Sequence, residues 1–195
     1  MLTQIPYNRD LAVAYARKWA LSRNPLFPDF AGGGGDCTNF VSQSLLAGCG
    51  VMDFTPTFGW YYRSLADRAP AWSGVNELFD FLTSSADFNT RMGEGPYATV
   101  VRNRREIQEG DVVQLANSEG RFYHTLIISG FEGNDILVCA HTNDALDRRL
   151  STYSYSSLRV LHVMGAFLEL PVSEVYSDLS DGLSLRTIVA QAEGV

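Results

Sequence analysis

Lysine is almost absent from this chain. Lys18 is the only lysine among 15 basic residues, and the formal net charge is −7. A phosphate-binding loop of the type G-x-x-x-x-G-K-[ST] needs a lysine directly after its glycines, so no such loop exists here. Proteins that bind nucleic acids gather Lys and Arg on one face, whereas these arginines are spread out except for Arg102, Arg104 and Arg105. We therefore expect no nucleic-acid partner.

Long apolar runs and cysteines are also scarce. No stretch approaches the roughly 18 to 20 apolar residues that a membrane-spanning helix requires, and the first ten residues lack the features of a secretory signal. We expect neither a membrane span nor a signal peptide. The three cysteines, Cys37, Cys49 and Cys139, cannot all pair, so at least one thiol is free. Cys and His spacings typical of zinc sites are missing, and the sequence predicts no metal and no cofactor.

The 195 residues, 46% of them hydrophobic, suffice for one domain with a sizeable core. Helical periodicity appears in residues 9–22, with Asn8 as N-cap, and again in residues 36–50, which end at Gly-Cys-Gly. A third, short helix is expected after a cap at Ser73. The second half is rich in β-branched and large apolar residues in four segments, which predict strands at 110–116, 122–130, 135–141 and 158–170.

Short links between the expected strands favour antiparallel pairing. Helices followed by an antiparallel sheet are typical of an α+β domain. We assign this domain to residues 1–170. Residues 171–195 are more polar and form a C-terminal extension, in which one weakly amphipathic segment is a candidate helix.

Cys37 is the first candidate for chemistry. It follows four glycines and Asp36, a good N-cap residue, and would be the first residue of a helix. A helix N-terminus carries about half a positive charge, and a thiol there can have its pKa lowered to roughly 3.5 to 7.5 when a cation is also near. Backbone N–H groups near Thr38 could hold an oxyanion. Asp36 opposes the thiolate unless its own charge is used in capping bonds.

A base and its orienting group are expected on the sheet. His124 begins a predicted strand, and a hairpin centred near residue 133 places it across from residues 141–143. Because strand side chains alternate between faces, His141 and Asn143 would project to one side, and either could hold the second nitrogen of His124. Cys, then His, then a polar orienting residue is the arrangement of papain-like thiol enzymes.

The segment "GDCTNFVSQSLLAGCG" at 35–50 resembles the leading motif of the putative amidase-domain family of bacterial proteins. Further matching text is "YNRDLAVAYARKW" at 7–19, Trp72, His124 and "HTND" at 141–144, so that the resemblance covers most of residues 7–165. A more distant resemblance is to NlpC/P60 and CHAP cell-wall hydrolases. Their "DCSG"-like and "GDVV"-like segments are echoed at residues 36–38 and 110–113.

The resemblance implies a papain-like fold and hydrolysis of an amide bond, with a peptide or a peptidoglycan peptide as substrate. It also implies a bacterial protein that is secreted or associated with the cell envelope. The nucleophile carries over to Cys37 and the base to His124. NlpC/P60 enzymes have a His in the third position, which matches His141, whereas CHAP enzymes have an acidic residue and an Asn two apart, which matches His141 and Asn143 together.

Two other functions stay open. The same fold could be a catalytically inactive module that binds a carbohydrate or a protein through an aromatic groove, for which Trp60 and Trp72 are candidates. It could also be an acyltransferase that uses the same residues. Cys49, Cys139 and His162 are interpreted as packing residues, since each lies within or at the end of an apolar element.

Overall fold

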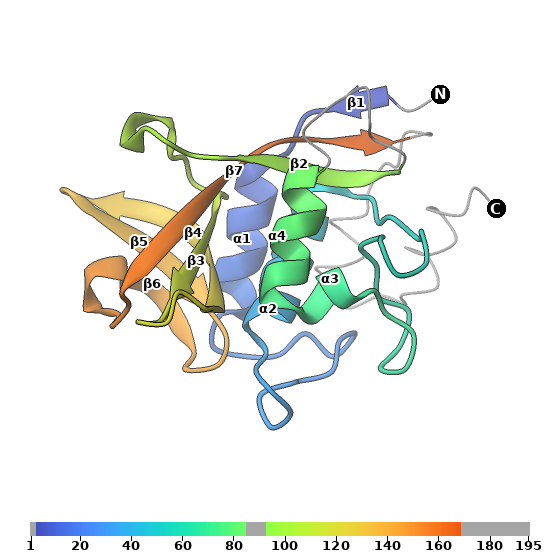
Figure 1. Ribbon diagram of the computed structural model, residues 1–195, viewed down its shortest axis with the longest axis horizontal. Coiled ribbons are helices and arrows are strands. Elements are labelled where there is room, and N and C mark those ends of the chain that lie inside the picture. Colours follow the sequence, from blue (N-terminus) through green and yellow to red (C-terminus); the bar gives the residue numbers. More distant parts are fainter. Residues whose placement is uncertain (1–2, 85–92, 169–195) are drawn as a thin grey trace.

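The computed structural model describes residues 3–84 and 93–168, in which helices pack against a curled antiparallel sheet (Figure 1). The helices are α1 (Arg9–Trp19), α2 (Cys37–Cys49), α3 (Pro70–Ser73) and α4 (Val75–Ser84), with short 3-10 helices η1 (Arg104–Glu106) and η2 (Leu150–Thr152). The strands are β1 (Thr3–Ile5), β2 (Gly95–Val100), β3 (Val112–Ala116), β4 (Phe122–Glu132), β5 (Asp135–Ala140), β6 (Ala145–Arg149) and β7 (Ser157–Leu168).

The sheet has the order β1-β7-β3-β4-β5-β6, and β2 also pairs with β7. Every pairing is antiparallel. The start of β7 pairs with β3, and the rest pairs with β2 and β1, so this strand joins the curled part of the sheet to its outer end (Figure 1). The predicted α+β class with an antiparallel sheet is confirmed. The expected extension at 171–195 lies outside the described residues.

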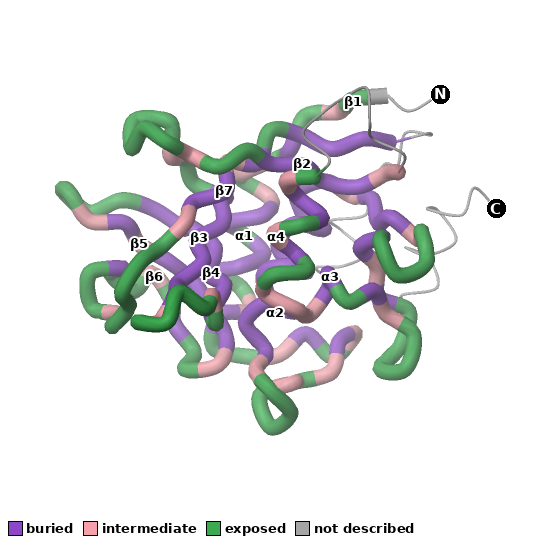
Figure 2. The backbone as a smooth tube through the Cα atoms, in the orientation of Figure 1, coloured by how far each residue is buried: buried purple, intermediate pink, exposed green. Residues whose placement is uncertain are grey.

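Helix α2 is the centre of the molecule. All of its residues are buried (Figure 2). The large apolar cluster around it contains side chains from all four helices and from one face of the sheet. A second cluster lies on the other face of the sheet and includes Val113, Leu115, Leu126, Ile128 and Val160. None of the helices in the described residues has the length and apolar character needed to cross a bilayer.

The helix ends follow local signals. Asn8 caps α1, since its side chain accepts a hydrogen bond from the N–H of Leu11 at 3.1 Å. Helix α2 begins at Cys37 as predicted and ends where Gly50 takes a left-handed conformation with φ 74°. The predicted cap at Ser73 was wrong, because a proline at position 70 starts the separate short helix α3, of which Ser73 is the last residue.

The four predicted strands correspond to β3, β4, β5 and β7, with ends shifted by two residues at most. Three further strands, β1, β2 and β6, are not predicted by the sequence pattern. β1 is short, β2 begins with Gly95 and Pro96, and β6 has the sequence ALDRR, whose charges are common on an edge strand. Each lacks the run of β-branched residues on which the prediction rested.

Trp60 and Trp72 are core residues. Both side chains are fully buried, and their ring centroids lie 5.0 Å apart. Nε1 of Trp60 donates to Oγ of Ser42 at 3.0 Å, and Nε1 of Trp72 donates to Oδ1 of Asn39 at 2.8 Å. The suggestion that these two tryptophans line a substrate groove is therefore wrong for this structure, because neither presents surface to a ligand.

We predict that Trp72→Ala lowers the free energy of unfolding by about 3 to 5 kcal/mol, because it opens a cavity beside α2 and leaves Oδ1 of Asn39 without its donor. Urea denaturation followed by circular dichroism measures this change. Phe58→Ala is the control, since Phe58 is 82% exposed and should lose no more than about 0.5 kcal/mol. Equal losses in the two variants would contradict the central place of Trp72.

Candidate functional site

The glycine run allows a backbone conformation before α2 that other residues rarely adopt. Residues 31–34 are exposed, and Gly34 and Gly35 have φ values of 119° and 114°, which side chains of L-residues rarely allow. A Cβ atom on Gly35 would lie 3.5 Å from Oγ1 of Thr142. These two glycines therefore let the chain turn from the loop into the helix, close to the segment that follows β5.

Cys37 is the first residue of α2 and is 6% exposed. Its Sγ lies 3.8 Å from Oγ1 of Thr38, which is 3.0 Å from Oγ1 of Thr125 on β4. Burial raises the pKa of the Cys37 thiol above its ordinary value of 9.0, and hydrogen bonds from the backbone N–H of Thr125 and from Thr38 offset only part of this effect. The lowering of the pKa that a helix N-terminus can produce is therefore not found for this thiol, and burial is the largest cause of its shift.

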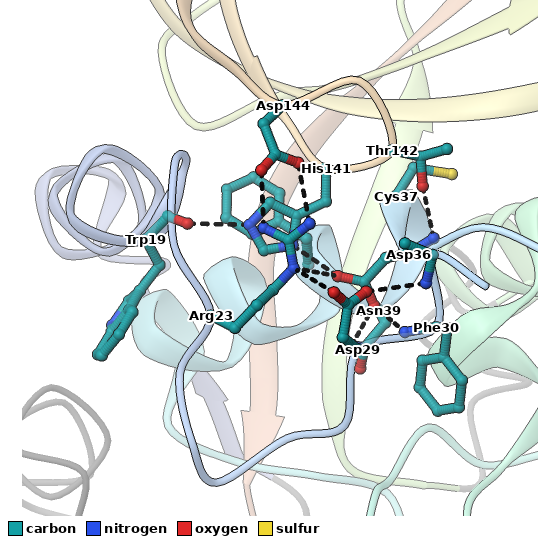
Figure 3. A network of polar contacts seen from close by, with 12 residues as sticks. Trp19, Arg23, Asp29, Phe30, Asp36, Cys37, Asn39, His141, Thr142 and Asp144 are labelled. Carbon is teal, nitrogen blue, oxygen red and sulfur yellow. Dashed lines mark hydrogen bonds and ion pairs between the residues drawn. The ribbon is translucent and has the colours of Figure 1, made fainter.

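Asp36 occupies the N-cap position, but its side chain does not bind the N–H groups of α2. Its buried carboxylate instead accepts hydrogen bonds from the N–H of Phe30 at 3.0 Å, from Nδ2 of Asn39 at 2.8 Å and from Nδ1 of His141 at 2.6 Å (Figure 3). Nε of Arg23 lies 3.6 Å away. The negative charge beside Cys37 is thus bound by its neighbours, while the N–H groups of the first turn of α2 receive no bond from it.

His141 links three segments. Its Nδ1 contacts Asp36, its Nε2 lies 2.9 Å from the carbonyl oxygen of Trp19, and its ring stacks on Phe40 with centroids 4.0 Å apart. Both polar partners are hydrogen-bond acceptors, and which ring nitrogen donates depends on the tautomer. His141 therefore ties the end of α1 to the start of α2 and has no nitrogen left for His124.

A bulge explains why the expected contact between His141 and His124 does not form. The predicted hairpin register is confirmed, with Glu132 opposite Asp135 and Ile127 opposite Cys139. Between these pairs the register shifts by one residue, next to Ser129. A one-residue shift exchanges the faces of all later side chains. Without it, the register of Glu132 and Asp135 would place Leu126 opposite His141 and His124 on the same face as His141; with it, Thr125 lies opposite His141 and His124 projects from the other face.

The segment 141–144 is also a turn rather than the end of a strand. β5 ends at Ala140, and Thr142 and Asn143 have φ values of 60° and 70°. Side chains alternate between faces only within a strand, and these residues lie in a turn. The expectation that His141 and Asn143 project to the same side therefore has no basis in the observed backbone. Asn143 is exposed at the surface of this turn.

His124 lies on β4 opposite Leu115, whose side chain belongs to the cluster on the face away from α2. Its ring lies between those of Tyr123 and Tyr153, with centroid distances of 6.2 and 6.0 Å. Burial, with a smaller contribution from the charge of Arg148, lowers the pKa of His124 from 6.5 to about 4. The imidazole is thus neutral at pH 7 and able to accept a proton.

Cys37 contacts β4 at Thr125, the neighbour of His124, whose side chain projects from the face of the sheet away from α2. The sulphur receives the backbone N–H of Thr125, the residue that follows His124. Among the hydrogen bonds of the described residues there is none between Sγ of Cys37 and the ring of His124. Within residues 3–84 and 93–168, no three His, Cys, Asp or Glu side chains gather in a way that could hold a metal ion.

The sequence motifs do not indicate Arg23, Thr125 and Thr142 as parts of this site. Arg23 binds both carboxylate oxygens of Asp144 at 2.9 Å (Figure 3), and Oγ1 of Thr142 accepts the N–H of Asp36 at 2.6 Å. Thr125 and Thr142 adjoin residues that the motifs had already selected, so their positions were a usable signal. Arg23 has no local pattern that predicts its role.

Comparison with known proteins gives one family and one relative. The family described as "Putative amidase domain" matches residues 6–164. "Uncharacterized protein YhbB" of Bacillus subtilis (strain 168) is 32% identical over an alignment of 153 residues, and the match covers 76% of this chain and 45% of that protein. The chain therefore spans less than half the length of this relative. No solved structure matches significantly.

We predict that the buried imidazole of His124 makes stability depend on pH. Between its pKa of about 4 in the folded protein and 6.5 in the unfolded chain, the unfolded state binds a proton that the folded state excludes. Stability should therefore fall as the pH decreases from 6.5 to 4, by about 3 kcal/mol in total. Urea unfolding of the wild type and of His124→Gln across this range measures the difference, and parallel pH profiles would contradict it.

Proposed function

Because the chain belongs to the putative amidase domain family, we propose that it is a thiol-dependent amide hydrolase with Cys37 as its nucleophile. The resemblance that its motifs suggested is confirmed by this family match. The observation that carries the proposal is the placement of Cys37: its sulphur lies at the first residue of α2, among the backbone N–H groups of Thr38 and Thr125. Such donors stabilise both a thiolate and the oxyanion of a tetrahedral intermediate.

A papain-like fold is part of the proposal. Its support is the combination of a central helix, which begins with the candidate nucleophile, and an antiparallel sheet, which carries a buried histidine on the adjacent strand β4. The order along the chain, with Cys37 before His124, is that of papain-like enzymes.

In the proposed reaction, Sγ of Cys37 attacks the amide carbon while the thiol proton passes to His124. Backbone N–H groups of Cys37 and Thr38 bind the oxyanion. The imidazolium then returns the proton to the leaving amine, which departs and leaves a thioester on Cys37. Water attacks this thioester, His124 takes a proton from the water and gives it to the departing sulphur, and the acid is released.

The two groups start this reaction uncharged. Burial raises the pKa of the thiol and lowers the pKa of His124 to about 4, so at pH 7 both the thiol and the imidazole are neutral. Proton transfer therefore accompanies the attack on the substrate instead of preceding it. The side chain of His124 projects from the face of the sheet away from α2, so the proposed reaction requires this ring to change position and reach the sulphur in the substrate complex.

The contacts of His141 limit which residue can be the third group of the triad. Since both of its nitrogens are used by Asp36 and the carbonyl of Trp19, we propose that His141 acts as a positioning residue that holds Asp36 and the start of α2. Asn143, in the exposed turn that follows, is the remaining sequence candidate for orienting His124. We propose a peptide or peptidoglycan peptide as substrate, supported by the likeness of residues 36–38 and 110–113 to segments of cell-wall hydrolases.

A catalytically inactive binding module is the second candidate function. It is favoured by three observations: the raised pKa of the Cys37 thiol, its 6% exposure, and the lack of a hydrogen bond between this sulphur and the described ring of His124. An acyltransferase would form the same thioester and pass the acyl group to an acceptor other than water, so it differs from the hydrolase in its second step alone.

We predict that Cys37→Ala lowers the hydrolysis of isolated peptidoglycan by about a thousandfold or more, and that His124→Gln lowers it by about a hundredfold to ten-thousandfold. Mass spectrometry of the released muropeptides measures the rates. Cys139→Ala is the matched control, because Cys139 is also a buried free thiol but lies in β5, and its rate should equal that of the wild type. Undiminished hydrolysis by Cys37→Ala would refute the assignment, and a wild type that cleaves neither peptidoglycan nor peptides would favour the binding module.

Alkylation by iodoacetamide tests the neutral resting pair. In a Cys49→Ala, Cys139→Ala background, the rate of Cys37 labelling should rise with pH and show a midpoint above 9.0, because burial raises the pKa of this thiol. His124→Gln should leave this midpoint unchanged, since no ion pair is present to be broken. A midpoint below about 7 would indicate a thiolate already stabilised by an imidazolium and would contradict the neutral pair.

A further inference from the structure

A cavity of about 750 Å³ opens at the end of the curled sheet where β2 leads into η1 and the β4–β5 turn. Its walls are residues 100–107, the turn at 132–136, residues 149–151 and the first part of β7. Cys37, Asp36, His124 and His141 are not among its lining residues. Its volume lies within the range of roughly 300 to 1,000 Å³ that small-molecule sites have. The cavity is thus separate from the proposed catalytic site.

The floor of this cavity is apolar. Ile136, Leu150 and Val160 line it and belong to the cluster on the sheet face away from α2. Around them, Leu158 and Tyr155 are each 37% exposed, although both are large and mainly hydrophobic. An apolar body placed here would remove this surface from water, which is favourable.

Negative charge in the cavity is already bound. Glu132 receives Nε and Nη2 of Arg149 at 2.8 and 2.5 Å. The carboxylate of Asp135 accepts bonds from the N–H of Ile136 at 2.9 Å and from the N–H and Oγ of Ser151. Glu132 is thus paired with Arg149, whereas Asp135 is held by neutral donors, and no ion pair joins either carboxylate to Arg102 or Arg104 among the described residues.

Two arginines of the cavity wall, in contrast, have no acidic partner among the described residues. Arg104 donates to the carbonyl oxygen of Asn134, which is neutral, so the charge of its guanidinium is not compensated. Arg102 is exposed and makes no side-chain hydrogen bond or ion pair with the residues that the structure describes. The fourth arginine of the lining, Arg159, is directed elsewhere, because its ring contacts are Phe79 and Phe122 and its Nε donates to Gln114.

We propose that this cavity binds a small organic acid, whose apolar body lies on Ile136, Leu150 and Val160 and whose anionic group pairs with Arg102 and Arg104. An arginine offers parallel N–H donors that match a carboxylate or sulfonate. The two guanidinium groups are uncompensated in a chain of net charge −7, and they stand at the edge of an apolar cavity. The proposal does not depend on the chemistry of Cys37.

The test uses two fluorescent probes with similar aromatic bodies, anilinonaphthalene sulfonate, which is anionic, and phenylnaphthylamine, which is neutral. The full chain is titrated with each probe. The double variant Arg102→Gln, Arg104→Gln should bind the anionic probe about tenfold more weakly, or weaker still, and bind the neutral probe as the wild type does. Arg105→Gln is the matched control, because Arg105 is a neighbouring exposed arginine that does not line the cavity.

Amide shifts in NMR spectra of the wild type locate the bound anionic probe. Shifts confined to residues 100–107, 132–136, 149–151 and 155–160 are expected. Absence of saturable binding, shifts centred on Cys37 and Thr125, or equal weakening by Arg105→Gln would overturn the proposal. Thermal melting of each variant shows that it is folded. Cys37→Ala should bind the anionic probe normally, so that failure of the hydrolase proposal and failure of this one are told apart.

Discussion

The complete burial of α2 is the constraint on which the rest of the structure depends. A helix with polar side chains can lie in a core only if each of them finds a partner, because an unpaired buried polar group costs about 1 to 3 kcal/mol. Thr38 meets Thr125, Asn39 meets Trp72, Ser42 meets Trp60, and Gln43 accepts the hydroxyl of Tyr15 at 2.7 Å. The polar residues of the motif "DCTNFVSQ" therefore serve mainly to hold this helix in the core, and the position of the helix determines where Cys37 lies.

Asp36 and His141 connect that helix to the rest of the molecule. Their contact, with the bond from His141 to the carbonyl of Trp19, joins α1, α2 and the turn after β5. The same burial that keeps these groups together removes water from Cys37 and His124, which shifts the pKa of the thiol upward and that of the imidazole downward. Burial at this site therefore favours the neutral thiol over the thiolate and the neutral imidazole over the imidazolium.

Much of the fold follows from local patterns, and the candidate site follows only in part. Asn8 and Gly50 mark helix ends, and runs of β-branched residues mark β3, β4, β5 and β7 because both signals depend on the backbone nearby. The partners of His141 could not be predicted in this way. A single irregular residue in the β4–β5 hairpin puts His124 and His141 on different faces of the sheet. Gly130 beside it was a usable signal, since an isolated glycine within a strand often marks a bulge.

The sequence by itself determined the α+β class, the start of α2 at Cys37, the register of the hairpin and, through its motifs, the family. These depend on interactions between residues close in the chain. The tertiary structure decided that Trp60 and Trp72 are core, that His141 binds Asp36 rather than His124, and that Cys37 is desolvated. Such outcomes depend on which distant segments exclude water from one another, because desolvation and hydrogen-bond partnership are properties of the packed molecule and not of any one stretch of chain.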